Sequence, residues 1–506
     1  MRKILLFIIT LLPALSFAQY SNDWIPFSPL QNYSLQEYFK VPVVNEGIYR
    51  INKSALVAGL VSVANNPTFD HRRFQIFHNG VEQYIYVYDE NQNNILEAND
   101  YIEFYGKPND GSFDVPLYND PTSQSNPNYS LINDTATYYL TWVTNTTPPF
   151  NTKRLQVVND TDFQNYTPSL FFLKTVRKDY FAEYRSGSTI GNEDFDMEIT
   201  AAEGWFDQVF KAGAPTTKNI NTPNIYSPGP QTLLQTVFVG ASNDQAQFDH
   251  KVKIEFNSSE IATIDYDGYE IRNESYTLNS TSLQSSNVIK FTALNPTGSV
   301  NEDKNALSFI SLTYPHSMSF TGESEMIFKM TIPFNSNSTK TYLEMTGLSG
   351  SSYYIYDFTD NLRIPVVETS GVFQALISNA SNGSDKEIGL FSDASTFTFS
   401  TVKAVNSPAN PRFRNFAAAG INHDYIIITH TSLLNAAEQY RIHRNNSGYN
   451  PIVVNIDELY GQFIYGVNKH PLAIRNFIRF VLYNWSAPNT HMFLLGKALH
   501  AKSIRH

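Results

Sequence analysis

Hydrophobic and polar positions follow one pattern over most of the chain and a different one near its C-terminal end. Up to about residue 410, short runs rich in aromatic and β-branched residues alternate with clusters of Asn, Ser, Gly and Pro. This spacing is typical of β-strands joined by turns. Examples are Val41–Ile51, Tyr101–Tyr105, Gln231–Val239 and Ala306–Tyr314. We therefore expect mainly β N-terminal domains of the β-sandwich or jelly-roll type.

One hairpin is marked by its turn residues. Asn79-Gly80 lies between the apolar runs Phe74–Phe77 and Tyr84–Tyr88. Asn and Gly tolerate the positive φ values of a type I′ turn. The pattern predicts that these two runs pair with each other across the turn.

The pattern changes after a linker at 407–413. Three apolar runs without alternation, Asp424–Thr429, Pro451–Ile456 and His491–Gly496, are separated by helical patterns at about 431–446 and 471–485. Strands that are apolar on both faces and separated by helices predict a parallel sheet covered on both sides. Since the sequence stops at His506, three strands in, we expect an incomplete α/β domain.

The second of these helices carries an apolar stripe expected to face the sheet. The stripe consists of Ile474, Phe477, Ile478, Val481, Leu482 and Trp485. In the first helix, Leu433, Leu434, Ala437 and Tyr440 are expected to do the same, and Gly448 is the predicted terminator.

The N-terminus has the pattern of a secretory signal peptide. Arg2 and Lys3 precede the apolar run Ile4–Leu12, and Ser16-Phe17-Ala18 forms a small-x-small cleavage site. The resulting division is a signal peptide at 1–18, a β-rich domain at 19–165, a β-sandwich domain at 166–410 and the start of the α/β domain at 416–506. No other run is long enough to span a bilayer, so the mature chain is expected to be exported without a transmembrane helix.

Charge and cysteine content narrow the classes of function. The net charge is −11 and no basic run occurs, which argues against nucleic acid as a partner. The 506 residues contain no Cys, which excludes disulfides and a thiol nucleophile within this sequence.

A candidate cation site lies in the stretch 89–100. Oxygen-bearing side chains occupy the spacing of a calcium loop at Asp89, Asn91, Asn93, Glu97 and Asp100. Asn94 stands where such a loop has Gly, and strands flank the stretch instead of helices. Two interpretations stay open: a bound cation, calcium, or an Asn-rich hairpin loop capped by its own side chains.

Other candidate residues have simpler interpretations. No compact ligand spacing links the late histidines, which are better explained by capping or solvated roles: His423, His430, His443, His470, His491, His500 and His506. Asp424 and Asp457 mark element boundaries rather than a carboxylate pair. Trp205-Phe206 suits a buried core better than a sugar-stacking platform.

Several motifs together resemble the opening of the gingipain-type cysteine peptidase domain. They are Asp424–His430, Arg441, Gly448, Ile456–Tyr460, Phe463, Gly466, Ala473–Phe477 and Phe493–Gly496. Shorter pieces resemble the β-rich N-terminal half of the sortase-like members of that family: Gly47–Ile51, Tyr101–Gly106, Glu203–Phe206 and Leu312–Pro315.

The resemblance implies a caspase-like fold and cysteine-type peptide hydrolysis. In the sortase-like members it implies action in the type IX secretion system, where C-terminal sorting domains are removed from exported cargo. The implied partners are protein substrates or secretion components, and the implied location is the periplasm, the outer-membrane surface or the extracellular space.

Two departures from the family pattern matter. Lys497 stands where many relatives carry an acidic residue, and no position matches the catalytic His or Cys. Two hypotheses follow: the N-terminal portion of such a peptidase, inactive alone, or a non-catalytic β-rich envelope protein that binds or scaffolds secretion components.

Overall fold

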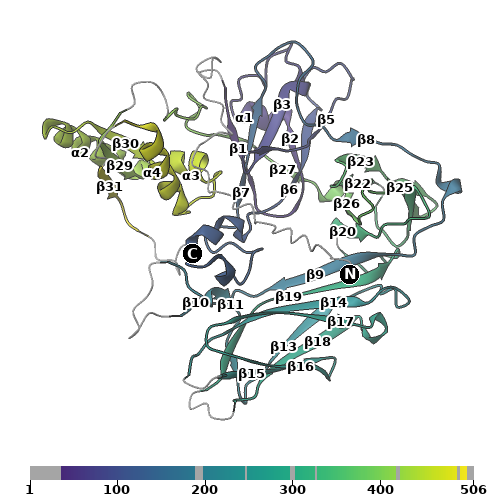
Figure 1. The fold of residues 1–506 in the computed structure, drawn as a ribbon. Coiled ribbons are helices and arrows are strands. Elements are labelled where there is room, and N and C mark those ends of the chain that lie inside the picture. Colours follow the sequence, from purple (N-terminus) through teal and green to yellow (C-terminus); the bar gives the residue numbers. More distant parts are fainter. Residues whose placement is uncertain are drawn as a thin grey trace, which may run out of the picture. The chain divides into compact units, whose positions relative to one another are not determined.

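The computed structural model describes the chain in separate stretches, whose helices and strands are drawn in Figure 1. The stretches are residues 36–188, 198–244, 248–296, 302–324, 327–350, 352–416, 422–486 and 491–498. They form two compact units, residues 36–78 with 82–411, and residues 412–498 with 79–81. The predicted signal peptide lies outside the described residues. Within the described stretches, no helix is long and apolar enough to cross a bilayer.

Two small sheets form the first part of the β-rich unit. A five-stranded sheet has the order β28-β1-β7-β3-β4, and a four-stranded sheet has the order β27-β2-β6-β5. Their strands are β1 (Phe39–Val43), β2 (Gly47–Asn52), β3 (Phe74–His78), β4 (Val81–Glu82), β5 (Tyr86–Tyr88), β6 (Tyr101–Gly106), β7 (Ala136–Trp142), β27 (Phe397–Thr398) and β28 (Lys403–Ala404), with the short helix α1 (Lys53–Ala58) after β2. One buried apolar cluster contains Val41 and Leu140 from the first sheet and Ile51 and Ile102 from the second, so the two sheets share a core.

The predicted turn at Asn79-Gly80 is present. The strand pairing predicted across this turn is wrong, except for the residues directly next to the turn. Asn79 and Gly80 have φ values of 51° and 75°, and the Gln83 N–H donates to the Ile76 carbonyl. The chain then leaves β3, because β5 pairs with β6 in the other sheet. The run Tyr84–Tyr88 therefore connects the two sheets instead of extending one hairpin.

A continuous ten-stranded sheet dominates the rest of the β-rich unit. Its order is β17-β14-β19-β9-β20-β26-β22-β23-β8, and β12 also pairs with β19. The strands are β8 (Gln156–Val157), β9 (Phe171–Asp179), β12 (Phe210–Lys211), β14 (Thr232–Gly240), β17 (Ile271–Leu278), β19 (Lys304–Ser317), β20 (Ile327–Ile332), β22 (Tyr353–Asp357), β23 (Leu362–Pro365) and β26 (Lys386–Ser392). The long strands β9 and β19 run side by side through its middle (Figure 1).

Each half of the long sheet is covered by a smaller sheet. One is β13 (Thr216–Asn221), β18 (Ser286–Ala293), β15 (His250–Phe256) and β16 (Ser259–Tyr266); the other is β21 (Lys340–Met345), β25 (Val372–Ser378) and β24 (Val367–Thr369). Phe238 of the long sheet shares a core with Ile254, and Leu390 of the long sheet shares a core with Leu343. The β-sandwich prediction is confirmed.

A two-stranded ribbon, β10 (Glu183–Ser186) and β11 (Glu203–Phe206), carries the Trp205-Phe206 pair. Both side chains are buried in apolar clusters. They are therefore core residues. The sequence pattern also favoured this interpretation over a sugar-stacking platform.

Strands from distant parts of the sequence close several sheet edges. Residues 397–404 form two short strands, of which β27 pairs with β2 and β28 pairs with β1. Conversely, β8, which comes from the N-terminal part of the sequence, pairs with β23 of the long sheet. The division of the β-rich part near residue 165 stays a prediction.

A buried carboxylate links the small sheets to the long sheet. Glu103 on β6 is fully buried, and its carboxylate lies 2.7 Å from Arg50 Nε and 2.9 Å from Arg363 Nε. The Tyr356 hydroxyl donates to Glu103 at 2.5 Å. Burial alone would lower the pKa of Arg363, but the Glu103 charge raises it above its usual value. The three partners thus hold Glu103 as a paired charge between sheets.

A second buried ion cluster involves β9, β19 and the loop before β20. Glu323 lies 2.6 Å from Lys174 Nζ and 2.6 Å from His316 Nε2, and Asn224 Nδ2 donates to it at 2.7 Å. Burial alone would raise the pKa of Glu323, but the hydrogen bonds from His316, Lys174 and Asn224 lower it to about 2. The ionised carboxylate therefore stabilises the folded state.

The second unit is the predicted α/β segment. Three parallel strands have the order β30-β29-β31, with Thr429 aligned with Asn455 and Leu495. The elements are β29 (Tyr425–Thr429), α2 (Leu434–Asn446), β30 (Pro451–Asn455), α3 (Ile456–Phe463), α4 (Leu472–Asn484) and β31 (His491–Leu495). Gly448 follows α2 with φ 89°, and its N–H donates to the Asn445 carbonyl, so it terminates the helix as predicted.

The buried face of α4 is turned relative to the predicted stripe. Phe477 and Val481 are buried as expected, but Leu482 is 68% exposed. The polar Asn476 is buried instead, because its Nδ2 donates to the Phe463 carbonyl at the end of α3. Ala437 of α2 is buried as expected, whereas Leu433, directly before α2, is exposed. Helix–helix packing, rather than contact with the sheet alone, decides which face of α4 is buried.

The substitution Glu103→Gln is expected to lower the free energy of unfolding by about 3–5 kcal/mol, because Arg363 loses its counter-charge and Arg50 keeps only its ion pair with Asp393. The matched control is Glu302→Gln, since Glu302 forms a half-exposed ion pair with Lys211. That change is expected to cost less than about 1 kcal/mol. Urea denaturation of both variants measures the difference, and equal effects would contradict a structural role for Glu103.

The stabilisation by Glu323 is expected to depend on pH. The pKa of Glu323 is lowered from its usual value of 4.5 to about 2 in the folded state. The stabilisation is therefore complete above about pH 5 and is lost as the pH falls from about 5 to about 2. The stability difference between the wild type and Glu323→Gln should therefore shrink by about 2 kcal/mol between pH 6 and pH 3. Urea denaturation at a series of pH values measures it. A difference that stays constant with pH would show that Glu323 is not held ionised.

Candidate functional site

The carboxyl ends of β29, β30 and β31 form the first candidate site. In open α/β sheets, ligands bind outside the carboxyl ends of the strands. Here the Thr429 hydroxyl donates to the Leu495 carbonyl at 2.9 Å, and Asn455 Nδ2 donates to the Thr431 hydroxyl at 2.9 Å. These bonds fix the loops that leave the sheet. The residues are polar and neutral, so they position the edge without supplying acid or base chemistry.

The late histidines serve mainly at element ends. His430 accepts the Ser432 N–H before α2, and His470 Nδ1 accepts the Leu472 N–H at the start of α4. Asp424 accepts the Asn450 N–H just before β29, and Asp457 lies in the first turn of α3. These contacts agree with the interpretation of the histidines as helix caps and of the two aspartates as residues at element boundaries. His500 and His506 lie outside the described residues.

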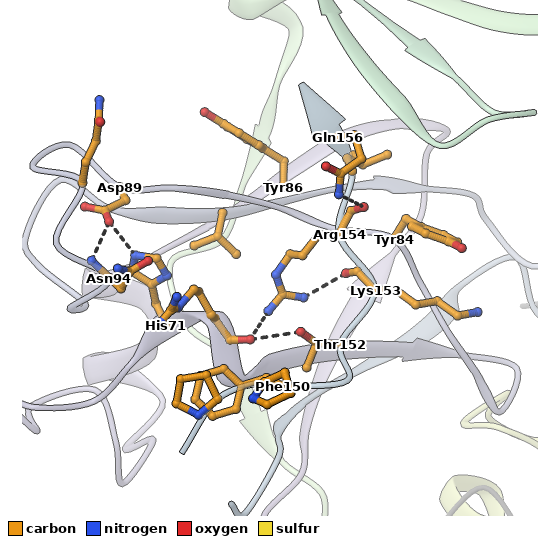
Figure 2. Close-up of a pocket in the computed structure, with 16 residues that line it drawn as sticks. His71, Tyr84, Tyr86, Asp89, Asn94, Phe150, Thr152, Lys153, Arg154 and Gln156 are labelled. Carbon is orange, nitrogen blue, oxygen red and sulfur yellow. Dashed lines mark hydrogen bonds and ion pairs between the residues drawn. The ribbon is translucent and has the colours of Figure 1, made fainter. Parts of the chain in front are cut away.

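The second candidate site is a pocket of about 930 Å³ in the β-rich unit (Figure 2). Tyr84 and Phe150 contribute aromatic rings to its wall, and Lys153 Nζ lies 5.3 Å from the centre of the Tyr84 ring. His71 and Asp89 line another part of the pocket, and they face each other in the figure.

Arg154 braces this pocket through three backbone carbonyls. Its guanidinium donates to the carbonyls of Lys153, Arg72 and Phe74 at 2.8, 2.5 and 2.8 Å. Burial lowers the pKa of Arg154 to about 10, although the nearby Glu82 and Asp70 act in the opposite direction. The group therefore stays charged at neutral pH, with its donors directed at the protein's own backbone.

The predicted cation loop is split between two environments. Asn91 donates to Glu97, and Asn93 Oδ1 accepts the Ile95 N–H, so these three side chains bond within the loop. Asp89 and Asp100 turn inward instead, and one ligand atom of each lies within 4.8 Å of a ring nitrogen of His71. His71 could not be predicted from the loop spacing, because it stands on an earlier 3-10 turn, His71–Arg73, outside the loop. The cation at this loop stays a proposal.

Comparison with known proteins identifies the class to which the α/β segment is similar. Residues 418–502 match the model of peptidase family C25, which confirms the resemblance to gingipain-type peptidases for this segment. With this match, the fold is a β-rich N-terminal part followed by a caspase-like segment.

One solved structure is similar over nearly the whole chain. It is the crystal structure of dimeric latent PorU from Porphyromonas gingivalis, with a TM-score of 0.54 and 14% identity. The match covers 92% of this chain and 42% of that chain, so the present chain spans less than half of the length of PorU. At this identity the likeness shows a shared fold alone.

Weaker likenesses carry no argument about function. The carbohydrate-binding module CBM36 in complex with calcium and xylotriose has a TM-score of 0.17 and 8% identity, over 28% of this chain and 98% of its own. A family 35 carbohydrate-binding module from Clostridium thermocellum has a TM-score of 0.15 and 13% identity. This match covers 29% of the present chain and 98% of the module. No curated protein sequence matches the chain.

The brace formed by Arg154 can be tested by substitution. Arg154→Met is expected to lower the free energy of unfolding by about 2–3 kcal/mol, because three carbonyls lose a charged donor. Lys153→Met is the control, since it removes a neighbouring cation whose ammonium lies over the Tyr84 ring and should cost about 1 kcal/mol or less. Thermal and urea denaturation compare the two. An effect of Arg154→Met no larger than that of Lys153→Met would contradict the bracing role.

Proposed function

We propose that this chain is the N-terminal portion of an exported gingipain-like cysteine peptidase, and that the peptidase is a sortase of the type IX secretion system. The observation that carries the proposal is the match of residues 418–502 to peptidase family C25. The fold likeness to PorU over 92% of the chain supports it, because that likeness includes the β-rich part as well. The substrate class would be the C-terminal sorting domains of exported cargo proteins.

The chemistry of such a peptidase sets a clear requirement. A cysteine peptidase needs a thiolate nucleophile and a base within hydrogen-bond reach. The 506 residues contain no Cys, so the nucleophile would have to come from residues outside this sequence. In this proposal, the parallel strands β29, β30 and β31 form part of the sheet on which the catalytic pair is mounted, and residues 1–506 alone do not hydrolyse peptides.

The β-rich unit would position the substrate or guard the active site. The PorU structure is described as latent and dimeric, and those words apply to PorU. For the present chain we propose that the β-rich unit, which accounts for most of the described residues, has this guarding role. Export of the product to the periplasm or cell surface would follow from the leader pattern at residues 1–18.

The gene sequence beyond codon 506 tests the proposal. We expect the reading frame to continue into a Gly-His-Gly turn and a later strand that ends in Cys. Sequencing the genomic DNA across codon 506 provides the measurement. A stop codon directly after His506 would contradict the peptidase proposal and would favour a non-catalytic envelope protein that binds or scaffolds secretion components.

A further inference from the structure

A buried cluster on the wall of the pocket in Figure 2 joins three parts of the first small sheets. His71 comes from the 3-10 turn before β3, Asp89 follows β5, and Asp100 precedes β6. One ligand atom from each lies within 4.8 Å of the other two, and His71 Nε2 is 3.1 Å from Asp89 Oδ2. We propose that these three side chains form a binding site for a divalent transition-metal ion, Zn²⁺ in particular.

The unsatisfied polar atoms of the cluster are the independent observation that points to an ion. His71 is 3% exposed, and in the described part of the chain its Nδ1 has no hydrogen-bond partner, while its Nε2 makes only the 3.1 Å contact with Asp89 Oδ2, which lacks hydrogen-bond geometry. Asp89 Oδ1 is likewise buried without a hydrogen-bond partner there. Buried polar atoms are nearly always paired, and each unpaired one costs about 1–3 kcal/mol. One bound cation would give a partner to one ring nitrogen of His71 and to the Asp89 carboxylate at once.

Backbone hydrogen bonds already hold the two carboxylates in place. Asp100 Oδ1 and Oδ2 accept the N–H groups of Glu90 and Glu97 at 3.0 and 2.6 Å, and Asp89 Oδ2 accepts the Asn94 N–H at 2.7 Å. Such outer contacts orient ligating groups and are a regular feature of metal sites. Each oxygen keeps a further lone pair for an ion. Because His71 and Asp89 also line the pocket, an ion has a path to the site.

The donor set favours zinc over the calcium suggested by the loop spacing. Calcium takes six to eight oxygen ligands, whereas imidazole suits zinc and related transition metals. Three of the five predicted calcium ligands, Asn91, Asn93 and Glu97, are engaged within the loop instead. Tetrahedral zinc ligands stand about 3.4 Å apart, so ligand atoms that lie within 4.8 Å of one another would have to approach by at most about 1.4 Å around the ion.

The proposed ion would clamp the 89–100 loop against the turn that carries His71. The two segments already meet through the Asp70–Ile95 bridge and the hydrogen bond from His71 N to the Asn94 carbonyl at 3.1 Å. The ion adds a cross-link among residues distant in sequence, so zinc should raise the melting temperature.

Isothermal titration of the full chain with ZnCl₂ alone and with CaCl₂ alone tests the site. We expect one tightly bound Zn²⁺ per chain, with at least tenfold weaker binding in Asp89→Asn and in His71→Asn. Glu97→Gln is the matched control, because it removes a carboxylate of the same loop that is not one of the three ligands, and it should bind Zn²⁺ within twofold of the wild type. Absence of zinc binding, or equal weakening by Glu97→Gln, would overturn the proposal.

A spectroscopic readout covers the case in which the His71 or Asp89 variant does not fold. The wild-type chain loaded with one equivalent of Cu²⁺ is expected to show coupling to a single imidazole in pulsed electron paramagnetic resonance. No imidazole coupling, or coupling to several imidazoles, would overturn the assignment to His71, Asp89 and Asp100.

Discussion

The buried charge of Glu103 is the constraint on which the β-rich unit depends. Glu103 comes from the four-stranded sheet, while Arg363 and Tyr356 come from the far end of the ten-stranded sheet. An unpaired buried carboxylate would be strongly unfavourable, so Glu103 is compatible only with an arrangement that brings both sheets to it. Arg50 extends the network to Asp393, directly after β26. Residues separated by most of the chain are thereby fixed relative to one another.

Short strands exchanged between sheets act together with this network. β8, β27 and β28 each pair with strands far away in sequence. The β-rich unit is consequently one compact body, although it contains several sheets and separate apolar cores. A body of this kind is suited to presenting or restraining a neighbouring catalytic segment, which is the role proposed for it.

The α/β segment could be predicted well from the sequence because its strands are apolar on both faces and its helices have clear end signals. Several strands of the β-sandwich could not be predicted from the sequence. β16 and β17 carry many exposed polar residues and lie at the edges of their sheets, where one row of backbone groups is unpaired and apolar alternation is weak. The exposure of Leu482 could not be predicted either, because it follows from the packing of α4 against α3, where Phe477 and Phe480 contact Phe463. His71 carried no local signal, since only tertiary pairing brings it to Asp89.

If this chain forms the front part of a cysteine peptidase, as proposed, the complete gene product hydrolyses peptides through a thiol. The most direct measurement is peptide hydrolysis by the native gene product isolated from the cell envelope, with and without an alkylating thiol reagent, beside the recombinant 506-residue chain. We expect hydrolysis by the native product that the reagent abolishes, and none by residues 1–506. Native product without hydrolytic activity, or activity that the reagent leaves unchanged, would contradict it.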